Sequence, residues 1–329
     1  MRLFFYALRD HDEIHYLEEC AEKYGFEYGF TSEYPSPDNL DLVKGYEAVS
    51  IITNPLGPEM LDRMKELGVK YITTRSIGYE HIDVVHAYSI GLKVAHVTYA
   101  PESVADYTIM MMLIACRKMP YIMQGAAVQD FSLKGKIGRE ISASTIGVLG
   151  TGNIGATVVK HLSGFGCRIL MNDVYEKDEL RVYGNYVDKE TIYKQSDIIT
   201  LHVPAYADNY HMVDSKAIDT MKDGVIIVNC ARGSLIDTSA LISALCSGKV
   251  GFAALDTIEN EAGLYYLDRS GDILDNQDRA VLLSMPNVYL TPHMAFYTER
   301  TVYDMINNAC IGLLNFEKGI ENPFEVKRS

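Results

Sequence analysis

The stretch "GVLGTGNIG", Gly147–Gly155, decides the fold of this chain. Its Gly150, Gly152 and Gly155 match the pattern G-x-G-x-x-G, with an apolar run before it and a helical pattern after it. In a strand–turn–helix unit, the first glycine allows a tight turn. The second lets the backbone approach a pyrophosphate, and the third lets the helix pack closely on the strand. The motif in this context predicts a dinucleotide-binding turn.

Two further features indicate which dinucleotide binds. The N–H groups of Asn153 and Ile154 lie at the start of the expected helix, where free backbone donors face phosphate groups. The next apolar run, "RILMND", ends in Asp173, eighteen residues past Gly155. A carboxylate there can bond both ribose hydroxyls of NAD and would repel a 2′-phosphate. The spacing therefore favours NAD over NADP.

Short apolar runs alternate with helical patterns on both sides of this turn. After Thr145 the expected strands are "TIGVLG", "RILMND", "DIITLHV", "GVIIVNC", "GFAALD" and "NVYLTP". In the first hundred residues they are "LFFYAL", "AVSIIT", "YITT" and "KVAHV". This alternation predicts an α/β protein with two doubly wound parallel sheets. A buried helix is expected from Pro101 to about Met119, and one long amphipathic helix ends the chain.

Unusual residues follow several strands of the second series. They are Val203 and Pro204; Cys230, Ala231 and Arg232; Asp256, Glu259 and Glu261; and His293. In open α/β sheets the ligand crevice lies outside the carboxyl ends of the strands, so these residues are expected on one edge. A structural arginine, a surface glutamate and a core histidine are each the commoner interpretation of a single residue. Their coincidence on one edge favours a site.

Arg232, Glu261 and His293 suit the reduction of a 2-oxo acid. An arginine can bind a carboxylate through two parallel hydrogen bonds, which a lysine cannot do. A histidine changes charge near neutral pH and can give the carbonyl oxygen its proton. A nearby carboxylate such as Glu261 favours the imidazolium form and fixes its tautomer. A bound nicotinamide cofactor supplies the hydride.

The composition excludes several other classes. The chain has 329 residues and a net charge of −14, which disfavours nucleic acid as a partner. The six cysteines are scattered with no zinc-type spacing, and they indicate a reduced, cytoplasmic protein. No metal is expected, since the histidines show no ligand spacing. The apolar run "YTIMMMLIAC" is too short to span a membrane, and the apolar N-terminal run is too short for a signal peptide.

The chain resembles the D-isomer-specific 2-hydroxyacid dehydrogenases over almost its whole length. The motifs that carry the resemblance are "GVLGTGNIG", "DIITLHVP", "MKDGVIIVNCARGSLIDTSALISAL", "GFAALDTIENEAGLYY" and "MPNVYLTPHMAFYTE". The finer match, through "TRSIGYEHID", "ESVADYTIMMML" and "HMAFYTER", is to the D-lactate and D-2-hydroxyisocaproate dehydrogenase branch. That branch includes the D-lactate dehydrogenases of vancomycin resistance.

The resemblance implies a role for each matching residue. Arg232, Glu261 and His293 are the implied catalytic residues: carboxylate ligand, histidine partner and general acid/base. Ile77 and Gly78 through their backbone, with Tyr99, Arg232 and Tyr297, are the implied substrate contacts. The implied cofactor contacts are Gly150, Gly152, Asn153, Ile154, Gly155, Asp173, Val203, Pro204, Asn209, Cys230, Ala231 and Asp256.

The resemblance also implies a domain arrangement that the residue pattern leaves open. The pattern alone divides the chain at about residue 100 and leaves the final helix unplaced. The family implies a Rossmann NAD-binding domain at 100–298, inserted into a flavodoxin-like substrate domain at 1–99 plus 299–329. It also implies a homodimer formed through a helix at about 101–119.

Three departures from the family bear on specificity. Met294 follows His293 where close relatives often carry threonine, and Tyr79 is larger than many residues beside the carboxylate loop. Asp173 differs from the vancomycin-resistance enzymes, which lack an acid at this position. The favoured reaction is pyruvate to D-lactate. The alternatives are a D-2-hydroxyisocaproate or aromatic 2-hydroxyacid dehydrogenase, or a vancomycin-resistance-type D-lactate dehydrogenase.

A different class of function uses the same fold. Some transcriptional corepressors sense NAD without catalysis, and such proteins can keep the three catalytic residue types. The compact length of 329 residues favours an enzyme.

Overall fold

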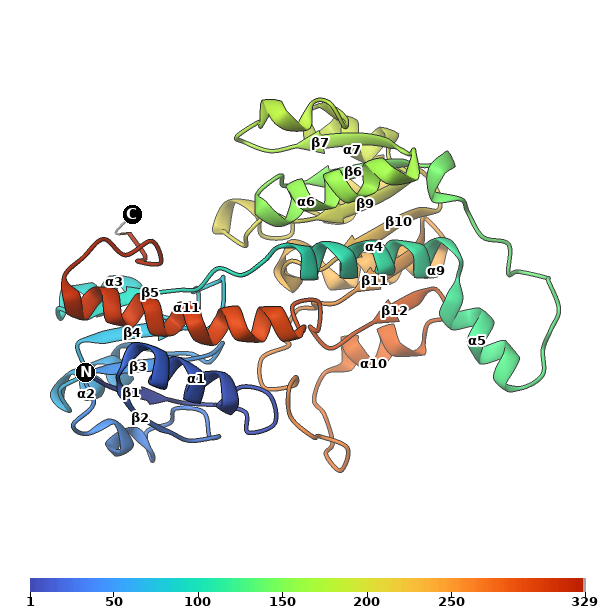
Figure 1. Cartoon of the computed structure of the whole chain (residues 1–329). Helices are drawn as coiled ribbons and strands as arrows, with labels where there is room; N and C mark the ends of the chain where they lie inside the picture. The colour runs from blue at the N-terminus through green and yellow to red at the C-terminus, as the bar shows by residue number, and fades with distance from the viewer. Residues whose placement is uncertain (328–329) are drawn as a thin grey trace. The chain divides into compact units, whose positions relative to one another are not determined.

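The computed structural model describes residues 1–327 and divides into two compact units. Unit 1 consists of Met1–Ala100 and the chain from Tyr297 onward, and unit 2 is Pro101–Phe296. The named strands of both sheets pair in parallel, and helices cover both faces of each sheet (Figure 1). The architecture is the predicted doubly wound α/β class.

Unit 1 is built on a five-stranded sheet. Its order is β2-β1-β3-β4-β5. The strands are β1 (Arg2–Phe5), β2 (Glu27–Phe30), β3 (Ala48–Ile51), β4 (Tyr71–Thr74) and β5 (Lys93–Ala95). The helices are α1 (Ile14–Tyr24), α2 (Pro58–Glu66), α3 (Val84–Ser89) and α11 (Glu299–Lys318).

The alternation of side chains along β1 creates the two cores of unit 1. Leu3 and Phe5 pack with α1 and α11, whereas Phe4 packs on the face of α2 and α3. The final helix therefore belongs to unit 1, although almost two hundred residues separate it from the rest of that unit in sequence. Thr298 caps its start, since its side chain accepts from the Thr301 N–H.

Unit 2 is built on a seven-stranded sheet. Its order is β12-β11-β10-β9-β6-β7-β8. The strands are β6 (Thr145–Leu149), β7 (Arg168–Asn172), β8 (Asn185–Tyr186), β9 (Ile198–Leu201), β10 (Val225–Asn229), β11 (Val250–Leu255) and β12 (Val288–Leu290). The helices are α4 (Glu102–Cys116), α5 (Met119–Ala127), α6 (Asn153–Leu162), α7 (Lys189–Gln195), α8 (Ser215–Thr220), α9 (Thr238–Ser247) and α10 (Gln277–Ser284).

The strand order of unit 2 reverses at β6. From β6 the chain runs outward through β7 and β8, and then crosses back to β9 and continues to β12. The loops after β6 and β9 therefore leave the sheet in opposite directions at its carboxyl edge. This is the position at which open α/β sheets bind their ligands.

Two strands and one helix of the structure were not predicted. Six strands were expected in the second sheet, and β8 is a seventh. Its two residues are too few to show an alternating pattern. Strand β2 is a half-exposed edge strand, "EYGF", whose Gly29 leaves room for the Tyr46 ring. The helix expected to end near Met119 ends at Cys116, and α5 follows it.

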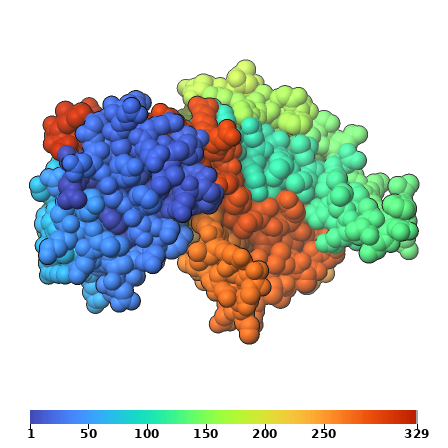
Figure 2. Space-filling view, turned by 60° about the horizontal axis from the view of Figure 1, so that its bottom comes forward, coloured from blue at the N-terminus to red at the C-terminus, as the bar shows by residue number. Residues whose placement is uncertain are grey.

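A projecting segment distinguishes unit 2. Helix α5 and the chain to about residue 140 extend away from the rest of this unit (Figures 1 and 2). Phe131, Leu133 and Ile137 in this segment expose at least 77% of their surface. We call residues 117–140 the arm. Exposed apolar side chains gathered on one projection are typical of a protein–protein contact.

Candidate active site

The glycine turn after β6 has the geometry that a phosphate-binding loop needs. Gly150 has φ +93°, and a Cβ there would lie 2.7 Å from the His202 backbone. A Cβ on Gly155 would lie 1.9 Å from the Gly150 oxygen. The space beside Gly152 is open to 4 Å. Packing therefore requires the first and third glycines, and the second leaves the backbone accessible. The turn fits a pyrophosphate at the start of α6.

Asp173, directly after β7, holds the glycine turn through hydrogen bonds. Its Oδ2 accepts hydrogen bonds from the Thr151 N–H at 2.5 Å and the Thr151 hydroxyl at 3.2 Å. Its Oδ1 accepts from the Tyr175 N–H at 3.0 Å. The carboxylate remains only half-buried, at the edge where a ribose would lie. The role of Thr151 could not be read from the sequence, because the contact joins residues twenty-two apart.

The remaining expected cofactor residues form ordered loops at the same edge. Asn209 donates to the Pro204 carbonyl at 2.6 Å and accepts from the Tyr206 N–H at 2.8 Å. The side chain of Asn209 thus shapes the loop that begins at Val203. Burial raises the pKa of the Cys230 thiol, which keeps this side chain neutral.

His293 and Glu261 form a close pair at the carboxyl edge of the sheet. His293 Nδ1 lies 2.6 Å from Glu261 Oε1, and each side chain is 24% exposed. The other Glu261 oxygen accepts from the Ile258 N–H at 3.1 Å. Because Nδ1 faces the carboxylate, Nε2 is the ring nitrogen left for a substrate. The pair has the arrangement of an oriented general acid/base.

The backbone at His293 is held in an uncommon conformation. Its φ is +54°, in the left-handed region that few non-glycine residues adopt. The His293 N–H donates to the Asp256 carbonyl at 2.8 Å, and the Tyr266 hydroxyl donates to the His293 carbonyl at 2.8 Å. Tyr266 also meets Phe296 edge to face. Tyr266 was not singled out in the sequence, since nothing there places it beside His293.

Asp256 also holds the turn that contains His293. Its fully buried carboxylate accepts from the Thr291 hydroxyl at 2.6 Å, the Met294 N–H at 2.8 Å and the Ala295 N–H at 2.9 Å. Three hydrogen bonds satisfy the charge in the interior. The resemblance implies a cofactor contact here, and the hydrogen bonds of the structure give Asp256 a place in holding the His293 turn.

Arg232 follows β10, which lies beside β11, and β12 lies beyond β11. The carboxyl ends of β10, β11 and β12 therefore present Arg232, Glu261 and His293 along one edge of the sheet. The Arg232 carbonyl accepts from the Asn229 amide at 2.8 Å, and its own Nη1 donates to the Ala231 carbonyl at 2.9 Å. A Cβ on Gly233 would lie 2.0 Å from the Ile258 backbone, so the loops after β10 and β11 are in direct contact.

The expected substrate residues of unit 1 lie in three loops: Ile77 and Gly78 after β4, Tyr99 after β5, and Tyr297 before α11. Gly78 accepts a hydrogen bond from the Ser76 hydroxyl through its carbonyl at 2.7 Å. The Tyr297 hydroxyl donates to Asp12 at 2.6 Å, and the Arg9 guanidinium lies 5.6 Å from the centre of the Tyr297 ring. Neither contact of Tyr297 was predicted.

Tyr79 has one aromatic neighbour in unit 1. Its ring lies 5.5 Å from that of His96, and burial lowers the pKa of His96. A neutral imidazole suits this partly apolar setting.

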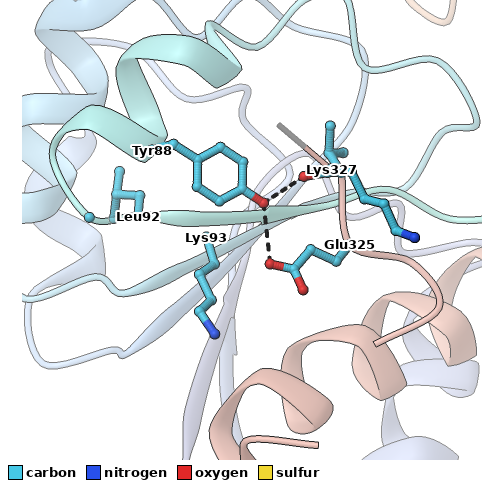
Figure 3. Close-up of a pocket in the computed structure, with 7 residues that line it drawn as sticks. Tyr88, Leu92, Lys93, Glu325 and Lys327 are labelled. Atoms are coloured by element: carbon cyan, nitrogen blue, oxygen red, sulfur yellow. Dashed lines mark hydrogen bonds between the residues drawn. The ribbon is translucent and has the colours of Figure 1, made fainter. Parts of the chain in front are cut away.

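Unit 1 contains a cavity of about 440 Å³ that none of the predicted site residues lines. It is lined by Tyr88, Gly91, Leu92, Lys93, Glu325, Val326 and Lys327. Figure 3 shows Tyr88 directed toward Glu325, and the Tyr88 hydroxyl donates to the Val326 carbonyl at 2.6 Å. These bonds attach the C-terminal segment beside β5. None of the expected catalytic or cofactor residues lines this cavity.

Within residues 1–327, no three histidine, cysteine or acidic side chains are grouped as metal ligands. No helix among these residues combines the length and apolar character needed to cross a membrane.

Comparisons with known proteins identify the family of this chain. Residues 109–295 match the family of "D-isomer specific 2-hydroxyacid dehydrogenase, NAD binding domain". The chain is 39% identical over 320 residues to an aromatic 2-oxoacid reductase of Clostridium sporogenes, covering 96% of each chain. It is 42% identical over 292 residues to a D-specific alpha-keto acid dehydrogenase of Enterococcus faecalis, covering 88% of this chain and 89% of that one.

A solved structure extends the match to the whole chain. The D-lactate dehydrogenase of Treponema pallidum superposes with a TM-score of 0.90 at 30% identity, and all of both chains is covered. The family match and the relatives agree. The chain belongs to the D-isomer-specific 2-hydroxyacid dehydrogenases, and it is an NAD-dependent oxidoreductase of D-2-hydroxy acids.

Proposed function

We propose that His293, Glu261 and Arg232 carry out the reduction of a 2-oxo acid. The Arg232 guanidinium binds the substrate carboxylate and polarises the adjacent carbonyl. His293 Nε2 donates a proton to the carbonyl oxygen as negative charge develops there. Glu261 holds the imidazole through Nδ1 and fixes its orientation. NADH, when bound, supplies the hydride to the carbonyl carbon. The 2.6 Å contact between Glu261 and His293 is the observation that carries this assignment.

The other predicted site residues complete the proposal. The residues expected to hold NAD in unit 2 run from the glycine turn to Asp173, Asn209 and Cys230. In unit 1, the N–H groups of Ile77 and Gly78 bind the substrate carboxylate, and Tyr99 and Tyr297 face the substrate. Unit 1 is then the substrate domain, and unit 2 is the NAD-binding domain.

Pyruvate, reduced to D-lactate, is the favoured substrate. The resemblance of the whole chain to D-lactate dehydrogenases supports this choice, and so does the fold-level match to the Treponema pallidum enzyme. Aromatic 2-oxo acids are the second candidate. The Clostridium sporogenes relative supports them, as does the aromatic pair Tyr266 and Phe296 beside His293. An apolar aromatic wall would favour a larger acyl group.

A substrate panel tests this proposal. Values of kcat/KM for pyruvate, 2-oxoisocaproate and phenylpyruvate are measured with saturating NADH, and in parallel with NADPH. The lactate assignment requires pyruvate to be preferred, and a clear preference for either larger acid rejects it. A similar rate with NADPH would reject the ribose role of Asp173. A chiral separation of the product assigns the D configuration.

We also propose that the enzyme is a homodimer formed through α4 and the arm. The exposed side chains of Phe131, Leu133 and Ile137 support this, because a monomer rarely leaves such a group in water. Sedimentation equilibrium of the wild type and of Phe131→Asp/Leu133→Asp tests it. A dimer that dissociates in the variant is expected. A monomeric wild type would contradict the proposal.

A cytoplasmic location is the last part of the proposal. Six free thiols support it, since oxidising compartments favour disulfides. Fractionation of the native host with an antibody to the protein is the test, and recovery outside the cytoplasm would contradict it.

A further inference from the structure

Unit 2 contains a partly buried histidine–carboxylate pair outside the proposed catalytic residues. His211 Nε2 lies 2.7 Å from Glu259 Oε1, and the two side chains are 26% and 19% exposed. His211 Nδ1 lies 3.9 Å from Asp237 Oδ2. His211 has φ +52°, and the ring of Tyr210 stacks on it. An uncommon backbone conformation persists only where the surroundings hold it. We call His211 and Glu259 the clamp.

Glu259 joins His211 to the start of helix α9. Its Oε2 accepts from the Thr238 N–H at 3.1 Å and from the Thr238 hydroxyl at 2.7 Å. Burial alone would raise the pKa of Glu259, but the hydrogen bonds from His211 and Thr238 outweigh it and hold that pKa below its ordinary value. Both carboxylate oxygens are therefore used, and the side chain has one preferred orientation.

The clamp connects three loops that leave neighbouring strands. His211 follows β9, Thr238 lies in the segment after β10, and Glu259 follows β11, and these strands are adjacent in the sheet (Figure 1). Backbone bonds support the connection, since the His211 N–H donates to the Ser234 carbonyl at 2.9 Å. Gly233 packs against the Ile258 backbone with no room for a Cβ. The three loops thus form one ordered layer.

Each of these loops also carries a residue of the proposed site. Asn209 lies two positions before His211, Arg232 precedes Gly233, and Glu261 lies two positions after Glu259. Glu261 places one oxygen on His293 and the other on the Ile258 N–H, directly beside Glu259. A displacement of Ile258 and Glu259 would therefore move the carboxylate that orients His293.

We infer that the clamp is a positioning element that aligns Glu261 with His293. This inference rests on the proposed catalytic roles of those two residues. We do not assign His211 or Glu259 a contact with the substrate. They restrain the loop after β11 so that the Glu261 carboxylate stays in line with the imidazole. A misplacement of about 1 Å can reduce a rate by up to about 10²-fold, so a restraint of this kind is visible in kcat.

A double-mutant cycle tests the inference. His211→Ala, Glu259→Ala and the double variant are assayed with saturating NADH and with the preferred acid among pyruvate, 2-oxoisocaproate and phenylpyruvate. Each single variant is expected to lose about tenfold in kcat, with KM for the acid changed by less than about threefold. Because the two residues act as one unit, the double variant should lose no more than either single variant.

A conservative substitution separates positioning from general stability. In Glu259→Gln the amide oxygen can still accept from Thr238, and the amide N–H₂ can donate to a neutral His211. This variant is expected to regain most of the kcat lost in Glu259→Ala. Melting temperatures are recorded for all variants, and the assays are run well below them. Multiplicative losses in the double variant, or kcat values that follow the melting temperature alone, would overturn the inference.

Two control experiments show whether a loss of kcat comes from the clamp. His86 and Asp62 in unit 1 form a similar pair, with Nε2 2.8 Å from Oδ1 and His86 27% exposed. Alanine at both positions is expected to leave kcat unchanged. Glu261→Gln is measured in parallel. If Glu261→Gln retains full activity, the proposed catalytic role of Glu261 fails. If it loses activity while the clamp variants do not, only the clamp is rejected.

Discussion

Two ionisable pairs, one in each unit, follow strands of parallel sheets but differ in their access to solvent. In unit 1, Arg75 follows β4, and its Nε lies 3.2 Å from Glu13 with both side chains fully buried. In unit 2, His293 follows β12 and contacts Glu261 at 2.6 Å with each side chain 24% exposed. Both lie in sheets of the same topology class. A charge after a strand is therefore not enough to indicate a reactive group.

The partners of the two pairs explain the difference. The Arg75 guanidinium also donates to the carbonyls of Tyr6 and Ala7 and to the Ser50 hydroxyl. Its hydrogen-bonding capacity is directed inward, and it joins β1, β3 and β4. His293 has one ring nitrogen on Glu261 and leaves the other for a ligand. Partial exposure together with one fixed partner is what distinguishes a group that can exchange a proton from a group that only supports the fold.

The largest effect on stability is expected when the buried pair of Arg75 and Glu13 is broken. Glu13→Gln leaves the Arg75 charge in the interior with no anion beside its Nε. We expect a loss of about 3–5 kcal/mol in the free energy of unfolding, measured by urea denaturation. Glu18→Gln, on the exposed face of helix α1, should change this free energy by less than about 0.5 kcal/mol. Equal stability of Glu13→Gln and the wild type would remove the contrast between the two pairs.

The next effect concerns the exposed edge of unit 2. Arg232→Lys keeps the positive charge but cannot form two parallel bonds to a carboxylate. We expect kcat/KM for the 2-oxo acid to fall by about 10²-fold, because a donor aimed at the reacting group is lost. The dissociation constant for NADH, measured by fluorescence titration, should stay close to that of the wild type. A lysine variant with near-normal kcat/KM would show that the bidentate contact is not used.

His202 sharpens the comparison, because it also follows a strand of unit 2 but is partly buried, with its Nε2 2.9 Å from the Thr200 hydroxyl. Burial lowers the pKa of His202 to about 3. Since the folded value lies below the unfolded one, the stabilisation is complete above about pH 6.5 and is lost as the pH falls toward 3. From pH 7 to pH 5 the loss is about 2 kcal/mol.

The measurement compares two proteins at two pH values. Urea denaturation of the wild type and of His202→Asn at pH 7 and pH 5 should show this additional loss only in the wild type. The same pH dependence in both proteins would mean that His202 is not held neutral in the fold.

The smallest effect concerns cofactor choice. Asp173→Ala removes a carboxylate from the ribose edge and releases the Thr151 N–H. We expect NADH binding to weaken by about tenfold, as the loss of charge-assisted bonds would give. NADPH binding should change less, because repulsion of the 2′-phosphate is removed together with the bonds. An unchanged ratio of the two dissociation constants would contradict the ribose role.

Strands with several apolar residues could be predicted from the sequence, and so could the helix caps. "LFFYAL" and "GVIIVNC" lie on β1 and β10, and Gly25 ends α1 in the left-handed region as a capping glycine does. The short β8 and the edge strand β2 carry too little pattern to be recognised. They depend on pairing with β7 and β1, which a local pattern does not record.

Prediction from the sequence has the same limit for side-chain contacts in the site. Glu261 beside His293 is expected from the resemblance, and the hydrogen bond is present. The anchoring of the His293 turn by Asp256 and the bond between His211 and Glu259 were not expected. The first joins residues at least thirty-five positions apart, and the second joins residues forty-eight apart. Such contacts follow from strand order, so they become visible only when the sheet is assembled.

The most direct test of the central claim is the turnover of His293→Ala together with its binding of NADH. The account predicts that kcat for the preferred 2-oxo acid falls by about 10²–10⁴-fold, because the proton donor is removed. The dissociation constant for NADH should remain near the wild-type value, since the expected cofactor contacts are intact. Near-normal turnover in this variant would contradict the claim that His293 delivers the proton.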